Sequence, residues 1–199
     1  MQTPTIAAPV VVLVPKNRGL AAMAERGMRE YAASTPIERT FVRGEDVPFL
    51  ANELARTGRS MLAFTGDDLL DEWIESGRTL DPRVTRSKLT WTDPDARYGK
   101  PALCLIGPRG TQMPDRGVLR VAVCAKYGNL ARRYLRTLAT DTLSIDTVVI
   151  NGSVEAAILH NVADFMVDIV VSGKTIDQLD LDVREIIYTS DLAVLEANR

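Results

Sequence analysis

The sequence has few of the residues that metal and redox sites require. Its 199 residues include only two cysteines, Cys104 and Cys124, and a single histidine, His160. Both cysteines lie in apolar, strand-like runs, so we expect buried thiols in a reducing cytoplasm rather than a disulfide or a metal centre. His160 lies in a predicted helix, where we expect a structural or surface role rather than catalysis.

Two further absences narrow the functional class. No apolar run reaches the roughly 20 residues that span a bilayer. The run from Val10 to Val14 is short and is followed at once by Pro15, so it indicates a buried strand and not a signal peptide. The net charge of −2 argues against a general nucleic-acid binder. We therefore expect no membrane or nucleic-acid partner, although local positive charge in a cleft could still hold an anionic ligand.

Short apolar runs alternate with segments of helical spacing along the whole chain. With 46% hydrophobic and 25% charged residues, the composition is that of a globular protein. Alternating strands and helices are typical of parallel sheets in an α/β fold. The segment 107–117 is rich in glycine and proline, and it indicates a linker between two such regions.

The most informative local pattern is the run V-D-I-V-V-S-G-K-T-I from Val167 to Ile176. It predicts a buried strand that enters a short turn made of Ser172, Gly173, Lys174 and Thr175. Such a turn can present backbone N–H groups, two hydroxyls and one ammonium to a phosphate monoester. It is not a Walker A loop, because an acid stands where that motif has its first glycine. An ordinary strand-to-helix connection is the alternative interpretation.

Three acids precede this turn and suggest what else the ligand carries. Asp168 lies inside the apolar run, where an ionised group is costly unless it is paired or liganded. Asp164 lies four residues earlier, and it could equally be a capping or solvated residue. Glu155 ends the motif N-G-S-V-E and begins a predicted helix, where the helix dipole alone would favour an acid. Carboxylates beside a phosphate-binding turn suggest a ribose phosphate, with the acids on sugar hydroxyls or a metal ion.

Several segments together resemble the ATP phosphoribosyltransferases of histidine biosynthesis, in the order and at about the spacing of that family. The C-terminal half carries the more specific ones, R-V-A-V-C-A-K-Y-G-N-L-A-R-R-Y-L, N-G-S-V-E, A-D-F-M-V-D-I-V-V-S-G-K-T-I and E-I-I-Y-T-S-D-L-A-V-L-E-A-N-R. The N-terminal half carries the looser ones, V-P-K-N-R-G-L, V-R-G-E-D-V-P and F-T-G-D-D-L-L.

This resemblance implies a type II periplasmic-binding-protein-like fold, with two α/β lobes built on mainly parallel sheets. We expect the first lobe to comprise residues 1–106 and 183–199, because the C-terminal strand returns to it. The second lobe, residues 115–182, would carry the phosphate-binding turn. The ligand would lie between the lobes, at the carboxyl ends of the strands.

The resemblance also implies an activity, the transfer of phosphoribose from phosphoribosyl pyrophosphate to N1 of the adenine of ATP. Mg²⁺ would be held through the substrate, without direct protein ligands. The residues implied at the pyrophosphate leaving group are Lys16 and Arg18. Those implied for phosphoribosyl pyrophosphate are Asp164, Asp168, Ser172, Gly173, Lys174 and Thr175. Those implied for the nucleotide are Lys126, Tyr127, Asn129 and Glu155, with the Tyr127 ring available to stack on a base.

The resemblance further implies partners, and it leaves two alternatives open. Without a regulatory domain after Arg199, we expect a short-form catalytic chain that works with a separate regulatory subunit, as a homodimer or hetero-oligomer. The region from Leu20 to Ala63 departs from the family pattern. A paralogue that transfers phosphoribose to another heterocycle is therefore one alternative, and a non-catalytic module that binds an anionic metabolite is the other.

Overall fold

The computed structural model describes residues 9–31 and 36–198, which fold into two compact units. The first unit contains the chain up to Thr90 together with the residues from Asp191 onward, and the second contains Trp91–Ser190. Each unit is built on one five-stranded sheet with helices. The prediction of a two-lobed α/β protein is confirmed, but both sheets are mixed rather than mainly parallel, because each contains one strand that is antiparallel to both of its neighbours. Among the described residues, no helix has the length and apolar character needed to cross a bilayer.

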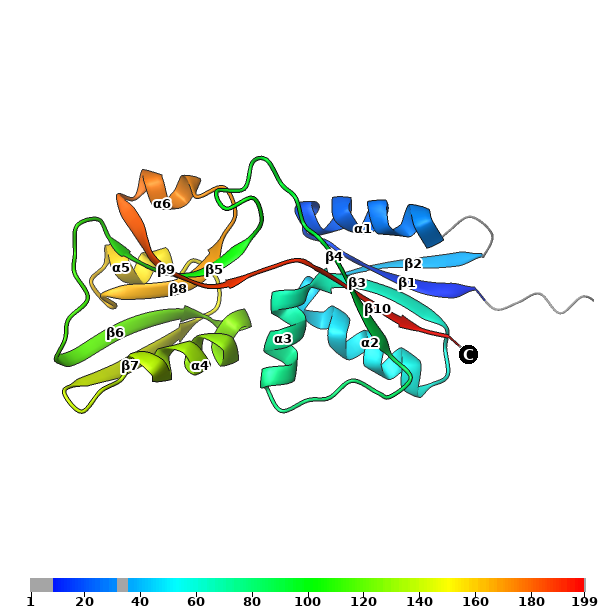
Figure 1. Cartoon of the computed structure of the whole chain (residues 1–199), viewed down its shortest axis with the longest axis horizontal. Helices are drawn as coiled ribbons and strands as arrows, with labels where there is room; N and C mark the ends of the chain where they lie inside the picture. The colour runs from blue at the N-terminus through cyan, green and yellow to red at the C-terminus, as the bar shows by residue number, and fades with distance from the viewer. Residues whose placement is uncertain (1–8, 32–35, 199) are drawn as a thin grey trace, which may run out of the picture. The chain divides into compact units, whose positions relative to one another are not determined.

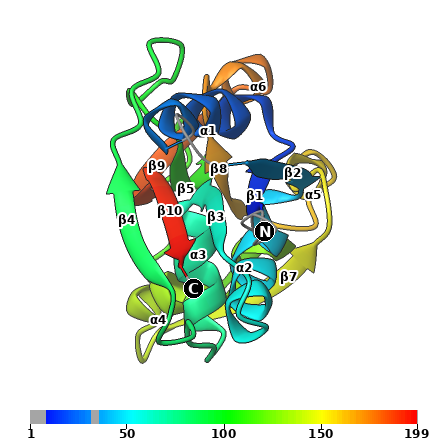
Figure 2. The same ribbon diagram turned by 90° about the vertical axis from the view of Figure 1, so that its right-hand side faces the viewer.

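The sheet of the first unit has the strand order β2-β1-β3-β10-β4, which Figure 2 shows from one edge to the other. Strands β1, β2 and β3 are parallel, whereas β10 is antiparallel to both of its neighbours. The elements of this unit are β1 (Val10–Pro15), α1 (Arg18–Tyr31), β2 (Ile37–Val42), the 3-10 turn η1 (Gly44–Asp46), α2 (Val47–Arg56), β3 (Met61–Gly66), α3 (Asp67–Glu75), β4 (Thr85–Leu89) and β10 (Leu192–Ala197).

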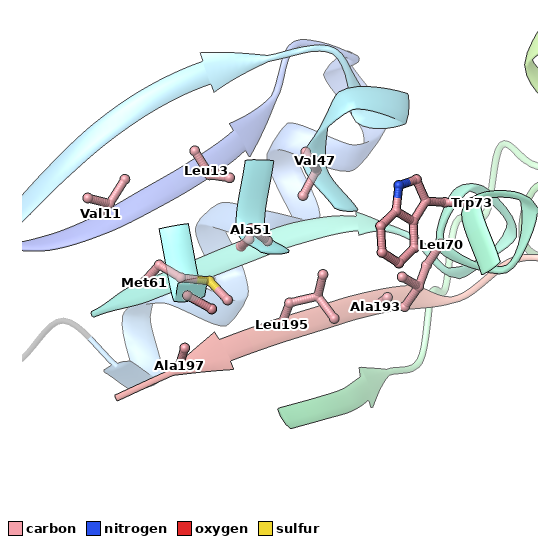
Figure 3. Close-up of a cluster of buried hydrophobic side chains, with 12 residues drawn as sticks. Val11, Leu13, Val47, Ala51, Met61, Leu70, Trp73, Ala193, Leu195 and Ala197 are labelled. Atoms are coloured by element: carbon pink, nitrogen blue, oxygen red, sulfur yellow. The ribbon is translucent and has the colours of Figure 1, made fainter. Parts of the chain in front are cut away.

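The core of the first unit explains why its central strands are apolar at nearly every position. Every residue of β3 is buried, as are all but the first of β1. Figure 3 shows one layer of this core, in which Val11, Leu13 and Leu195 of the sheet lie with Leu70 and Trp73 of α3. Strands that pack on both faces need apolar side chains on both, which gives the continuous runs seen in the sequence.

The sheet of the second unit has the order β7-β6-β8-β5-β9, and its strands are labelled in Figure 1. Strands β6, β7 and β8 are parallel, and β5 is antiparallel to both β8 and β9. The elements are β5 (Ala102–Pro108), β6 (Gly117–Cys124), the 3-10 turn η2 (Ala125–Tyr127), α4 (Gly128–Leu138), β7 (Leu143–Ile150), α5 (Glu155–Leu159), β8 (Phe165–Val170), α6 (Lys174–Gln178) and β9 (Leu181–Thr189).

The boundaries between the units differ from those expected from the sequence, 1–106 plus 183–199 and 115–182. Strands β5 and β9 belong to the second sheet, so the chain passes between the units near Thr90 and again near Asp191. The glycine- and proline-rich segment 107–117 instead joins β5 to β6 within one unit. Turn-forming residues mark the end of a strand, but they do not say which sheet the strand joins. Strand β5 belongs to the second sheet because it pairs with β8 and β9.

Candidate functional site

A pocket of about 290 Å³ lies in the second unit, where β8 ends and α6 begins. It brings together Glu155, Asp168 and the four residues of the predicted phosphate-binding turn. Its full lining is Ile106, Glu155, Met166, Asp168, Ile169, Val170, Val171, Ser172, Gly173, Lys174, Thr175 and Ile176. The pocket therefore combines an apolar floor, two carboxylates and a turn that can bind an anion.

The turn, which we call the phosphate loop, comprises Ser172–Thr175. Gly173 has a φ of +76°, a left-handed conformation that residues with a side chain rarely adopt. This conformation reverses the chain so that α6 begins at Lys174. The N–H groups of the first helical turn have no acceptor within the helix. Together with the exposed side chains of Lys174 and Thr175, they give the loop donors and one positive charge for a phosphate.

Asp168 is one of the two acids that line this pocket. One carboxylate oxygen, Oδ1, accepts the N–H of Ile169 at 2.8 Å, and the thiol of Cys124 on the neighbouring strand also hydrogen-bonds to the carboxylate. The pKa of Asp168 lies above its usual value, mainly because burial disfavours the charged form. The negative charge of Glu155 raises this pKa further, whereas the ammonium of Lys126 lowers it. Glu155 and Lys126 thus both act on the carboxylate of Asp168.

Residues predicted to contact a nucleotide follow β6, whose carboxyl end lies beside that of β8. Lys126 is exposed, and its Nζ lies 5.1 Å from the centre of the Tyr127 ring. Tyr127 is only 3% exposed, so its ring is part of the core and is not available for stacking on a base. Asn129 is half-buried, and its Oδ1 accepts a hydrogen bond from Arg132 at 3.0 Å. Of the four residues predicted for the nucleotide, Glu155 alone lines the 290 Å³ pocket.

Asp164 does not lie at the pocket, although the sequence grouped it with Asp168. It precedes β8, and its carboxylate binds Arg120 through the backbone N–H at 3.0 Å, Nε at 3.1 Å and Nη2 at 2.5 Å. This guanidinium lowers the pKa of Asp164. The physical reason is the rise of an extended chain, which separates residues four apart by roughly 13 Å. Asp164 therefore lies just before β8, whereas Asp168 lies in the second half of that strand, beside the pocket.

Lys16 and Arg18 lie in the first unit, at the carboxyl end of β1, and both are exposed. Between them, Asn17 caps helix α1, because its Oδ1 accepts the N–H groups of Gly19 at 3.0 Å and Leu20 at 3.3 Å. In the sequence V-P-K-N-R-G-L, the asparagine thus starts the helix and the two cations flank it.

Arg97 is a residue at this site that the sequence did not single out. Its backbone N–H donates to the carbonyl of Val171 at 2.7 Å, directly before the phosphate loop. Its guanidinium binds Asp177 of α6 at 2.8 Å. No local pattern could have identified it, because it lies about 75 positions from the loop that it contacts.

Comparison with known proteins gives one family and one fold. The family model described as ATP phosphoribosyltransferase matches residues 43–199. A protein named ATP phosphoribosyltransferase from Caldicellulosiruptor bescii is 34% identical over 110 residues, which cover 53% of this chain and 49% of that protein. Its namesake from Dictyoglomus thermophilum is 33% identical over 75 residues, covering 38% and 35% respectively. The chain thus matches between about a third and a half of the length of these relatives.

Solved structures show the same two-unit fold. The ATP phosphoribosyl transferase (HisG:HisZ) complex from Thermotoga maritima contains a chain with a TM-score of 0.68 and 22% identity, covering 94% of this chain and 87% of that one. The periplasmic aliphatic sulphonate binding protein of Escherichia coli has a TM-score of 0.59 and 13% identity, covering 95% and 61%. The type II periplasmic-binding-protein-like fold is therefore confirmed.

Proposed function

Because the chain belongs to the ATP phosphoribosyltransferase family, we propose that it transfers phosphoribose from phosphoribosyl pyrophosphate to N1 of the adenine of ATP. This reaction is the first step of histidine biosynthesis, and it releases pyrophosphate. One observation carries the proposal: Glu155, Asp168 and the phosphate loop line the same pocket at the end of β8.

The pocket suits the sugar phosphate of the donor. The phosphate loop holds the 5′-phosphate through first-turn N–H groups, the two hydroxyls and the ammonium of Lys174. Asp168 and Glu155 accept hydrogen bonds from the ribose hydroxyls. A volume of about 290 Å³ accommodates a group of this size and not a whole nucleotide as well. The acceptor must then bind beyond this pocket.

The reaction needs little acid–base chemistry. The lone pair of adenine N1 forms a bond to the anomeric carbon, while the bond from that carbon to the pyrophosphate oxygen breaks and its electron pair leaves with pyrophosphate. Positive charge grows on the sugar and negative charge on the leaving group. The task of the protein is to position the reactants and to stabilise these charges.

We assign the leaving group to Lys16 and Arg18, whose exposed side chains follow a buried strand. Among the described residues, no group of three or more histidine, cysteine or acidic side chains could hold a metal ion. We propose that Mg²⁺ is held through the phosphates of the substrate, without direct protein ligands. When bound, that ion would neutralise negative charge on the pyrophosphate.

We further propose a separate regulatory subunit as partner.

The proposal is tested by mixing the protein with phosphoribosyl pyrophosphate, Mg²⁺ and ATP. We expect pyrophosphate release and an absorbance change from the N1-substituted adenine product. Both should be seen with this protein alone or once a regulatory subunit is added. The variant Thr175→Val, which removes one phosphate-loop hydroxyl, should lower the affinity for phosphoribosyl pyrophosphate by roughly 1.5–3 kcal/mol, the usual contribution of a hydrogen bond to a charged group. Tight binding of phosphoribosyl pyrophosphate without any product from ATP would rule out ATP as the acceptor.

A further inference from the structure

The segment before β5 folds into a compact loop that presents Arg97. The N–H of Asp93 donates to the carbonyl of Gly99 at 2.9 Å, and the N–H of Gly99 donates to the carbonyl of Ala96 at 3.0 Å. The N–H of Ala96 donates in turn to the carbonyl of Asp93 at 3.1 Å. Ala96 is buried, which anchors this loop next to Arg97. Arg97 therefore extends from a fixed backbone.

Arg97 contacts the chain before, within and after the phosphate loop. Its N–H binds the carbonyl of Val171 at 2.7 Å, and its Nη1 binds Oδ1 of Asp177 at 2.8 Å. Between these two points, its side chain crosses Gly173. A Cβ atom placed on that glycine would lie 2.9 Å from both Cδ and Nη1 of Arg97. The arginine thus fills the space that a side chain at position 173 would need.

These contacts together amount to more than a surface ion pair. Asp177 is 57% exposed, so the pair with Arg97 is screened by water and by itself contributes little. The backbone hydrogen bond to Val171 does not depend on charge, and the close packing over Gly173 is available only because that residue lacks a side chain. Arg97 itself does not line the pocket.

We propose that Arg97 is a positioning residue that holds the phosphate loop in the conformation that binds the 5′-phosphate. The identity of that ligand rests on the proposed function, whereas the effect of Arg97 on the loop does not. A preformed loop binds phosphate without first losing conformational freedom, so its affinity depends on the residue that holds it. Gly173 accordingly serves two purposes, because few other residues adopt its left-handed φ and because its missing Cβ leaves the space that the arginine side chain occupies.

The first test needs no ligand. Hydrogen exchange is measured on peptides that span residues 171–178, in the wild-type protein, in Arg97→Ala and in Arg109→Ala. Arg109 is the matched control because it also pairs with an aspartate of this unit, Asp180 at 2.8 Å, which lies outside the phosphate loop. We expect faster exchange across 173–177 in Arg97→Ala alone. Equal exchange in all three proteins would overturn the proposal.

The second test separates the packing of Arg97 from the backbone strain at Gly173. The loss of thermal stability is measured for Arg97→Ala, for Gly173→Ala and for the double variant. The strain from φ +76° is the same in both backgrounds, whereas the contact at 2.9 Å exists only when Arg97 is present. We expect Gly173→Ala to cost less in the Arg97→Ala background. Strictly additive losses would mean that the arginine does not determine the need for glycine.

The third test links the loop to the substrate. In Arg97→Ala we expect the KM for phosphoribosyl pyrophosphate to rise about tenfold and kcat to stay within about twofold, because the loop must then order itself on binding. Arg109→Ala should keep both constants. An unchanged KM in Arg97→Ala would overturn the proposal. If the wild-type protein binds no phosphoribosyl pyrophosphate, the proposed function fails, and the exchange experiment still decides the role of Arg97.

Discussion

The placement of Asp164 leads to a prediction that separates stability from binding. The sequence grouped this acid with the substrate residues, whereas the structure pairs it with Arg120 at the start of β8, away from the pocket at the end of that strand. We expect Asp164→Asn to lower the stability of the protein and to leave the affinity for phosphoribosyl pyrophosphate unchanged within about twofold, since the substituted residue lies at the far end of the strand.

The size of the stability loss follows from the geometry of the pair. The Arg120 guanidinium reaches both carboxylate oxygens, at 3.1 Å and 2.5 Å, and the Arg120 N–H adds a third bond at 3.0 Å. A charged hydrogen bond of this kind contributes roughly 1.5–3 kcal/mol when shielded from water. Here the two side chains are 43% and 36% exposed, so solvent screening reduces the expected loss to about 1 kcal/mol. This corresponds to a fall in Tm of about 2–4 °C.

The pH dependence of this loss has a definite sign. The pKa of Asp164 is lower in the folded protein than its ordinary value of 3.8, because Arg120 stabilises the carboxylate. The stabilisation is therefore fully present above that ordinary value and is lost as the pH falls through the folded pKa. The difference in Tm between the wild-type protein and Asp164→Asn should be largest near neutral pH and should vanish in strong acid.

The assay combines thermal melts over a range of pH with calorimetric titration of phosphoribosyl pyrophosphate. Asp180→Asn is the matched control, since it breaks an ion pair whose side chains are 55% and 81% exposed and should change stability by less than about 0.5 kcal/mol. Asparagine tolerates the left-handed φ of +52° at this position. If Asp164→Asn were as stable as the wild type but bound phosphoribosyl pyrophosphate tenfold more weakly, the structural assignment of Asp164 would be refuted.

Three further predictions concern buried groups. Asp168→Asn should raise Tm at neutral pH. Burial holds the pKa of this carboxyl above 3.8, so ionisation of Asp168 lowers the stability of the folded protein as the pH rises past that value. Calorimetry should also show that the variant binds phosphoribosyl pyrophosphate about tenfold or more weakly. Gly107→Ala should cost about 1–3 kcal/mol in denaturant unfolding, because its Cβ would lie 2.5 Å from the Phe165 ring, whereas Gly128→Ala meets no atom within 4 Å and should cost nothing. Tyr127→Phe should leave the KM for ATP unchanged. Tyr127→Ala should lower the stability by about 3–5 kcal/mol, because it removes a large core side chain. A raised KM for ATP in Tyr127→Phe would show that Tyr127 contacts the nucleotide after all.

The sequence by itself predicted those features that depend on neighbouring residues. The alternation of apolar runs and amphipathic segments indicated an α/β protein, and the structure has that fold. The strand-to-turn pattern from Val167 to Thr175 predicted a phosphate loop, and the four residues of that loop do line one pocket with Asp168. Such features can be read from the sequence because strand, turn and helix start are set by residues within a few positions of one another.

The tertiary structure decided everything that depends on which segments pair. Strands β5 and β9 joined the second sheet through partners far along the chain, which moved the boundaries between the units. The extended conformation of β8 carried Asp164 away from Asp168, and packing around η2 buried Tyr127. Arg97 reached Gly173 although about 75 residues separate them. The physical reason is that local preferences fix the type of each element, whereas burial and strand pairing between distant segments fix where its side chains lie.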